Sequence, residues 1–162
     1  AEEFKFSGEY LLQDLQKKHN EYRELLQSIP QKKRFLVTSH DAFHYFTRAY
    51  LSEEEEVKQG TWMNRCQAPE GLAPESQLSG FDIERVVLHL VKYHIGVIFP
   101  ESNVSSDALK KIIDSCARKQ LEITLAKDPL FGDSMGEKGS PESSYKGMLE
   151  HNVQVIYSYL KK

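Results

Sequence analysis

His40 and Asp41 stand side by side in RFLVTSHDAFHYF, residues 34–46, where an apolar run gives way to an amphipathic one. A neutral imidazole can coordinate a divalent metal, and the positive end of a helix disfavours the charged ring and keeps its lone pair free. Asp41 is expected to accept hydrogen bonds from backbone N–H groups in the first helical turn. His40 is therefore a candidate metal ligand, with a surface or capping role as the alternative.

A second candidate ligand lies far along the chain, in PLFGDSMGEKG, residues 129–139. Asp133 stands there between two glycines, which allow the backbone to turn tightly and to approach other groups closely. Carboxylate oxygens are metal ligands, and aspartate is also a common turn residue. Neither motif by itself identifies a site, so the question is whether the fold brings the two together.

Hydrophobic periodicity predicts the elements that would position these residues. Apolar and aromatic residues from Leu11 to Ile29 recur at intervals of three and four, which predicts a long helix over about residues 6–28. Strands are expected at 34–38, 61–67, 95–99 and 120–126, and helices at 42–51, 81–93, 107–119 and 145–160. The acidic segment SEEEEVKQG, residues 52–60, is expected to be a solvated loop.

This alternation of strands and helices predicts an α/β fold: a four-stranded, mainly parallel sheet with helices on both faces, preceded by the long helix. The loops that leave the carboxyl ends of parallel strands gather at one edge of a sheet, where ligands bind. His40 belongs to the first of these loops and Asp133 to the fourth. We therefore expect both side chains at the same edge.

Other polar residues are candidates for supporting roles. Glu101 leaves the third predicted strand toward the same edge, where it would hold the ligand histidine or a loop backbone, or form a structural ion pair. His44 lies one helical turn after His40, a spacing that can place two ligands on one helix face, although packing is favoured. The remaining residues of this kind are given structural or loop positions: His19, Glu70, His89 and His151.

Composition excludes several classes of protein. The 162 residues can form one domain with its own core, and the 40% hydrophobic and 28% charged fractions are those of a globular domain. The net charge of -3 and the scattered basic residues give no footprint for nucleic acid. No run of about 18 apolar residues predicts a membrane-spanning helix. Cys66 and Cys116 belong to no CxxC motif and are expected to be buried thiols, with a disulfide as the alternative.

The motifs TSHDAF, residues 38–43, and GDSMGEKG, residues 132–139, resemble those in the C-terminal lobe of cluster A-I solute-binding proteins, which serve zinc, manganese and iron ABC importers. The resemblance covers the whole chain. It includes IPQKKRFLVTSHDAFHYFTRAY at 29–50, APEGLAPES at 68–76, GVIFPESNV at 96–104 and SYKGMLEHNVQVIYSYL at 144–160. The acidic segment and the residues around Trp62 depart from the general family pattern.

This resemblance implies that residues 1–30 form a linker helix to a missing N-terminal lobe and that residues 31–162 form the C-terminal metal-binding lobe. The family uses four ligands, two from each lobe, and the C-lobe pair carries over to His40 and Asp133. The implied function is to capture a divalent cation (zinc, manganese or iron) as a transported ligand and to deliver it to an ABC permease. The implied protein is a monomer without catalytic activity, periplasmic or extracytoplasmic, with lipid anchoring through the missing N-terminus as an option.

Two alternatives stay open at this point. A hydrolase would use His40 and Asp41 as a base and its orienting acid beside Ser39, but neighbours in one turn face each other poorly and no GxSxG motif occurs. An adhesin-type surface lipoprotein is the other alternative. The metal also stays open, because imidazole suits zinc and iron whereas carboxylate favours manganese.

Overall fold

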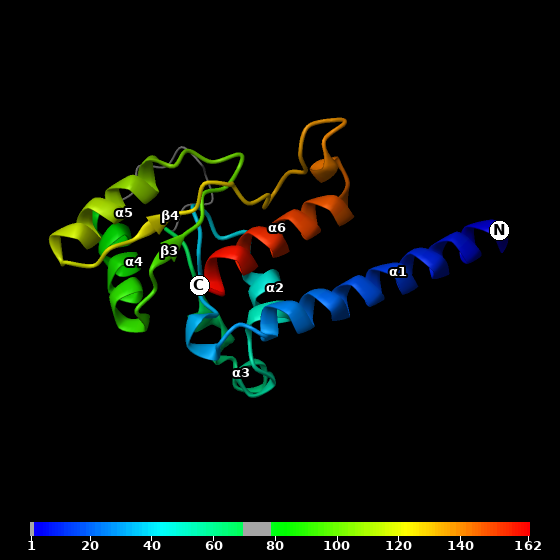
Figure 1. The fold of residues 1–162 in the computed structure, drawn as a ribbon, viewed down its shortest axis with the longest axis horizontal. Coiled ribbons are helices and arrows are strands. Elements are labelled where there is room, and N and C mark those ends of the chain that lie inside the picture. The colour runs from blue at the N-terminus through cyan, green and yellow to red at the C-terminus, as the bar shows by residue number, and fades with distance from the viewer. Residues whose placement is uncertain (1, 70–78) are drawn as a thin grey trace.

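The computed structural model describes residues 2–69 and 79–162. Its helices are α1 (Glu2–Gln27), α2 (His44–Phe46), α3 (Glu54–Gln59), α4 (Gly80–Tyr93), α5 (Asp107–Arg118) and α6 (Tyr145–Leu160). Its strands are β1 (Leu36–Val37), β2 (Cys66–Gln67), β3 (Val97–Ile98) and β4 (Thr124–Leu125), and short helices cover Gln31–Lys33, Thr47–Leu51, Thr61–Arg65 and Pro141–Ser143. Figure 1 shows this α/β arrangement, with α1 extending away from the other elements. No helix among the described residues is long and apolar enough to cross a membrane.

The strands pair in parallel, as predicted, but they are much shorter than predicted. β1 pairs with β2 and β3 pairs with β4, which gives two sheets of two strands. A parallel bridge between Thr38 and Phe99 joins β1 to β3, and the Phe99 N–H donates to the Val37 carbonyl at 2.8 Å. The four strands therefore lie in the order β2, β1, β3, β4. This order brings the chain segments after β1 and β3 next to each other.

Helices cover both faces of the strands, which confirms that prediction. Leu36 and Phe99 belong to a core shared with α1 and α6, whereas Val37 and Ile98 belong to a second core shared with α4 and α5. Successive residues of a strand point to opposite faces, so neighbouring residues divide between the two cores. The central strands β1 and β3 are thus buried from both sides, as their apolar runs indicate, whereas β2 and β4 are not fully buried.

The apolar pattern of α1 is buried in the C-terminal part of the helix only. Tyr22 and Leu26 are buried in the core. Leu11 and Leu12, which belong to the same periodic pattern, are 57% and 68% exposed. The N-terminal part of α1 therefore presents apolar side chains to solvent.

The acidic segment is a helix and not the solvated loop that the sequence suggested. Glu53 caps α3, and Oε2 of Glu56 accepts a hydrogen bond from the Glu53 N–H at 2.9 Å, which completes a capping box. Gly60 ends α3 in the left-handed conformation, with φ of 74°. The predicted strand at 61–67 is wrong over Thr61–Arg65, which forms a 3-10 helix, and correct only at Cys66–Gln67.

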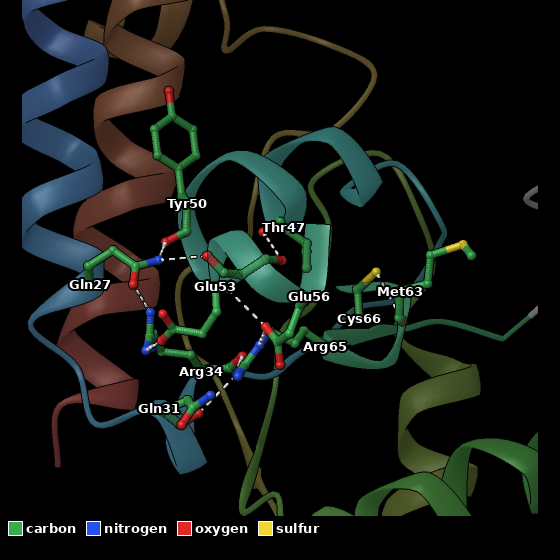
Figure 2. Close-up of polar contacts among 11 residues, drawn as sticks. Gln27, Gln31, Arg34, Thr47, Tyr50, Glu53, Glu56, Met63, Arg65 and Cys66 are labelled. Carbon is green, nitrogen blue, oxygen red and sulfur yellow. Dashed lines mark hydrogen bonds and ion pairs between the residues drawn. The ribbon is translucent and has the colours of Figure 1, made fainter. Parts of the chain in front are cut away.

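Two buried arginines connect this acidic segment to the start of β1 (Figure 2). Nε of Arg65 donates to Glu56 at 2.5 Å, and Nη1 of Arg65 donates to the Arg34 carbonyl at 3.1 Å. Arg34 in turn donates to the side chains of Gln27 and Glu53. Both arginines are under 5% exposed, so these contacts pair charges that would otherwise be buried alone.

The cysteines form no disulfide, which excludes that alternative. Cys116 is buried and Cys66 is half-buried, and both are free thiols. Burial raises the pKa of the Cys66 thiol to about 11. Both side chains therefore serve as small apolar groups.

Candidate metal centre

His40 lies at the carboxyl end of β1, in a bend before α2. Its backbone N–H donates to Oε1 of Glu101 at 2.8 Å, and its carbonyl accepts from Oγ1 of Thr38 at 2.6 Å. Helix α2 begins only at His44, so the expected place of His40 at the start of a helix is wrong, as is that of Asp41 in the first helical turn. The backbone of His40 is thus held by the side chains of Thr38, directly after β1, and Glu101, after β3, and not by a helix terminus.

Glu101 lies three residues after the end of β3 and forms hydrogen bonds to the β1 end through both its side chain and its backbone. Besides accepting the N–H of His40, it donates its own backbone N–H to Oγ of Ser39 at 3.2 Å. Its side chain is 0% exposed. Because these two hydrogen bonds cross between the strand ends, Glu101 fixes the backbone of the candidate ligand, the supporting role that the sequence suggested.

The segment before Asp133 is attached to the same strand end. The N–H of Leu130 donates to the Pro100 carbonyl at 2.8 Å, and the Leu130 carbonyl accepts from the Ser102 N–H at 2.9 Å. Glu101 and Leu130 therefore form a parallel bridge. The loop that carries Asp133 thus starts beside Glu101.

Helix α6 holds this loop from the other side. Asn152, 2% exposed, accepts from the Phe131 N–H at 2.9 Å and donates to the Phe131 carbonyl at 2.8 Å. Nε2 of His151 lies 2.9 Å from the Pro129 carbonyl, which confirms the structural role expected for that histidine. Sequence reasoning missed Asn152; the only signal was a polar residue on the apolar face of the last helix.

The fold brings His40 and Asp133 together, as predicted. Nδ1 of His40 lies 3.7 Å from Oδ2 of Asp133 and 3.7 Å from Oε2 of Glu101. Nε2 on the far side of the ring lies 3.4 Å from Oδ1 of Asp41. The side chain of Asp133 is 59% exposed and that of His40 is 14% exposed. The ring of His40 therefore lies between the buried carboxylate of Glu101 and the exposed carboxylates of Asp41 and Asp133.

Two polar atoms of this cluster are buried without a hydrogen-bond partner: Nδ1 of His40 and Oε2 of Glu101. Buried polar atoms are nearly always paired, and an unpaired one costs about 1–3 kcal/mol. Gly132 leaves room for the carboxylate, because a Cβ at that position would lie 2.6 Å from Oε2 of Glu101 and 2.9 Å from Cβ of Ala42. The close backbone approach expected of this glycine is thus confirmed.

Burial raises the pKa of the Glu101 carboxyl above its usual range, although the hydrogen bond from the His40 backbone opposes this shift. The negative charge of Asp133 raises the pKa further. An imidazole nitrogen beside carboxylate oxygens is a donor set that suits divalent transition metals. A cation placed here would also compensate the carboxylates. The residues present therefore fit a divalent cation.

Of the other polar candidates, only Asp41 lies beside His40 among the described residues. His44 is exposed, so the packing favoured for it is limited to surface contacts: its ring lies 6.3 Å from that of Trp62, and its Nδ1 lies 2.9 Å from the Asp41 carbonyl. Asp41 makes no capping bond to α2 and flanks the ring of His40 instead. His19 and His89 are half-buried among aromatic rings, as expected. Glu70 lies outside the described residues.

The candidate centre is a pair of ligands and not a closed cluster. Within residues 2–69 and 79–162, no group of three or more His, Cys, Asp and Glu side chains is arranged to hold a metal ion. His40 and Asp133 are the two ligands that the sequence predicted, and the Asp133 side chain is 59% exposed.

Known proteins resemble this chain over nearly its whole length. Metal-binding protein YtgA of Chlamydia muridarum is 42% identical over 96% of this chain and 46% of the relative. Manganese-binding lipoprotein MntA of Bacillus subtilis is 31% identical over 99% of this chain and 48% of the relative. The crystal structure of Fe(III)-bound YtgA from Chlamydia trachomatis superposes with a TM-score of 0.87 at 38% identity, over 97% of this chain and 52% of that one.

The chain thus spans about half the length of the relatives that it matches. Residues 1–159 match the family described as ZnuA, zinc-uptake complex component A, periplasmic. On this match, and on its similarity to YtgA, the chain belongs to the ZnuA family.

Proposed function

We propose that this chain is the C-terminal part of the solute-binding component of a divalent metal ABC importer. Residues 31–162 form the metal-binding lobe, and residues 1–30 form the linker helix to an N-terminal lobe. The protein captures zinc, manganese or iron in the cleft between the lobes and delivers the cation to the permease. The names of the relatives support this proposal, because they describe metal-binding proteins of bacteria, one of them bound to Fe(III).

The observation that carries the proposal is the convergence of His40 and Asp133 at one edge of the sheet, with 3.7 Å between Nδ1 and Oδ2. An ion with ligand bonds of about 2.0–2.2 Å can bridge a ring nitrogen of His40 and an oxygen of Asp133 once the exposed Asp133 side chain changes its rotamer. Two ligands leave half of a tetrahedral shell open, so the N-terminal lobe would supply the remaining two.

The exposed apolar side chains of α1 support the proposed role as a linker. Tyr10, Leu11 and Leu12 are 72%, 57% and 68% exposed, whereas Tyr22 and Leu26, farther along the same helix, are buried. Large apolar side chains gathered on one segment are a feature of contact surfaces. In the whole protein, the N-terminal lobe would cover them.

The proposed protein transports its ligand and catalyses no reaction. The nucleophile of the competing hydrolase would be Ser39, which is 6% exposed and whose Oγ already accepts the Glu101 N–H. We further propose a periplasmic or extracytoplasmic monomer without a nucleic-acid partner, anchored by lipid through a segment upstream of residue 1. Nothing in the structure favours an adhesin.

Metal content and affinity of the full-length protein test this proposal. Elemental analysis should find stoichiometric metal, and the protein should show no esterase turnover. His40→Ala and Asp133→Ala should each lower the affinity, measured by competition with a chelator, by more than about 100-fold, since loss of outer-shell partners alone costs 10–100-fold.

His19→Ala is the matched control, because His19 contacts Tyr50 and lies outside the cluster. It should leave the affinity nearly unchanged. Equal losses in all three variants would mean that the substitutions damage the fold and do not remove ligands. A metal-free protein with esterase activity would support the hydrolase.

A further inference from the structure

The two ring nitrogens of His40 have different surroundings. Nδ1 lies 3.7 Å from the buried Oε2 of Glu101 and 3.7 Å from Oδ2 of the exposed Asp133, and both Nδ1 and Oε2 are buried without a hydrogen-bond partner. Nε2 faces Oδ1 of Asp41 at 3.4 Å, on a side chain that is 43% exposed. A neutral imidazole carries one proton, so the partner of one nitrogen decides which nitrogen offers its lone pair.

The two oxygens of Glu101 differ in the same way. Oε1 is occupied by the backbone N–H of His40 at 2.8 Å, which leaves Oε2 as the atom that needs a donor. An ionised carboxylate only accepts hydrogen bonds, so the facing Nδ1 satisfies Oε2 if it carries the proton.

The carboxylate of Glu101 cannot turn away from the ring. Its side chain is 0% exposed, and the backbone of Gly132 covers Oε2 so closely that a Cβ there would lie 2.6 Å from it. Asp133, in contrast, is 59% exposed and can change its rotamer when an ion enters. The buried carboxylate is therefore the fixed partner of the ring.

We propose that Glu101 is a positioning residue that accepts the Nδ1–H of His40 and thereby directs the lone pair of Nε2 to the metal. This inference rests on the proposed metal-binding function of His40. A carboxylate behind a ligating imidazole fixes both the tautomer and the orientation of the ring. Closing the gap from 3.7 Å to about 3 Å needs only a small movement of the ring.

Glu101→Gln tests the tautomer without changing the shape of the side chain. The backbone N–H of His40 can only donate, so the amide oxygen must remain facing it and the amide NH₂ must face Nδ1. The NH₂ group then favours a bare Nδ1 and a proton on Nε2, the opposite tautomer. Glu150→Gln, an exposed site on α6, is the matched control.

The readout is the ¹⁵N NMR spectrum of the histidine rings in the metal-free full-length protein, at about pH 8, where an ordinary imidazole is neutral. The His40 signals are those that disappear in His40→Ala. The wild type and Glu150→Gln should carry the proton on Nδ1, and Glu101→Gln should move it to Nε2. Affinity for manganese or zinc should fall about 10–100-fold in Glu101→Gln only.

A wild-type proton on Nε2, or an unchanged tautomer in Glu101→Gln, would overturn the proposal and point to Nδ1 as the metal ligand. A changed tautomer with unchanged affinity would overturn it as well. The NMR readout needs no metal, so it still decides the role of Glu101 toward the ring if the wild-type protein binds no metal. In that case the proposed function fails separately.

Discussion

Nδ1 of His40 and Oδ2 of Asp133 lie 3.7 Å apart, although one follows β1 and the other follows β4. Hydrogen bonds connect the two through Glu101, which contacts the β1 end by its side chain and pairs with Leu130 by its backbone. The candidate ligands are therefore positioned by the edge of the sheet and not by contacts within either loop.

Gly132→Ala should weaken metal binding and lower stability. The added Cβ would lie 2.6 Å from Oε2 of Glu101 and 2.9 Å from Cβ of Ala42, so the loop or the buried carboxylate has to move. We expect a loss of about 1–3 kcal/mol in the free energy of unfolding, typical of overpacking, and a clear loss of metal affinity. Urea unfolding and chelator competition measure the two effects.

Gly96→Ala is the matched control for this substitution, because a Cβ at position 96 meets nothing within 4 Å. It should leave both stability and affinity close to the wild type. If the two alanine variants behaved alike, the close approach at Gly132 would have no part in the site.

Arg65→Ala should destabilise the protein by about 3 kcal/mol, because Glu56 loses its ion-pair partner and the Gln31 and Arg34 carbonyls each lose a hydrogen bond. Lys58→Ala removes an ion pair whose side chains are 70% and 67% exposed, and should change stability by less than about 0.5 kcal/mol. Urea unfolding separates the two results. Equal small losses would show that the arginine contacts in Figure 2 contribute little.

The sequence predicted the elements whose signals are local. The long helix and the alternation of strands and helices along the chain follow from hydrophobic periodicity. The positions of the two ligand loops follow from that alternation. Glu53 and Thr61 show where such reasoning ends. Helix α3 is capped by a glutamate, which is not among the preferred capping residues, and the segment after it is shaped by the buried contacts of Arg65 with residues distant in sequence.

The surroundings of His40 could not be predicted for the same reason. Its partners Glu101 and Asp133 are recognisable in the sequence as polar residues that follow strands. The hydrogen bonds by which Asn152 holds Phe131, in the loop that carries Asp133, depend on how α6 packs against that loop. Only the folded structure shows which of these groups lack a partner.

Stability should fall between about pH 6.5 and pH 4 in part because of His89. Burial, helped by the charges of Lys92 and Arg85, lowers the pKa of His89 to about 4. An unfolded chain takes up this proton near the usual imidazole pKa of about 6.5. The unfolded state therefore binds more protons within this window, so stability declines as the pH falls through it.

His89→Phe should flatten this part of the pH profile of the unfolding free energy, because the phenyl ring fits among Phe35 and Tyr93 and takes up no proton. His44→Phe, at an exposed position, should retain the wild-type slope. Urea titrations at several pH values between these limits give the slopes. Identical slopes in the wild type and His89→Phe would contradict the assigned cause.

Anomalous diffraction from crystals of the full-length protein loaded with zinc or manganese tests the central claim most directly. We expect one strong peak at about 2.0–2.2 Å from a ring nitrogen of His40 and from a carboxylate oxygen of Asp133. A fully occupied peak elsewhere, with neither side chain in contact with the metal, would contradict the assignment of both residues as ligands.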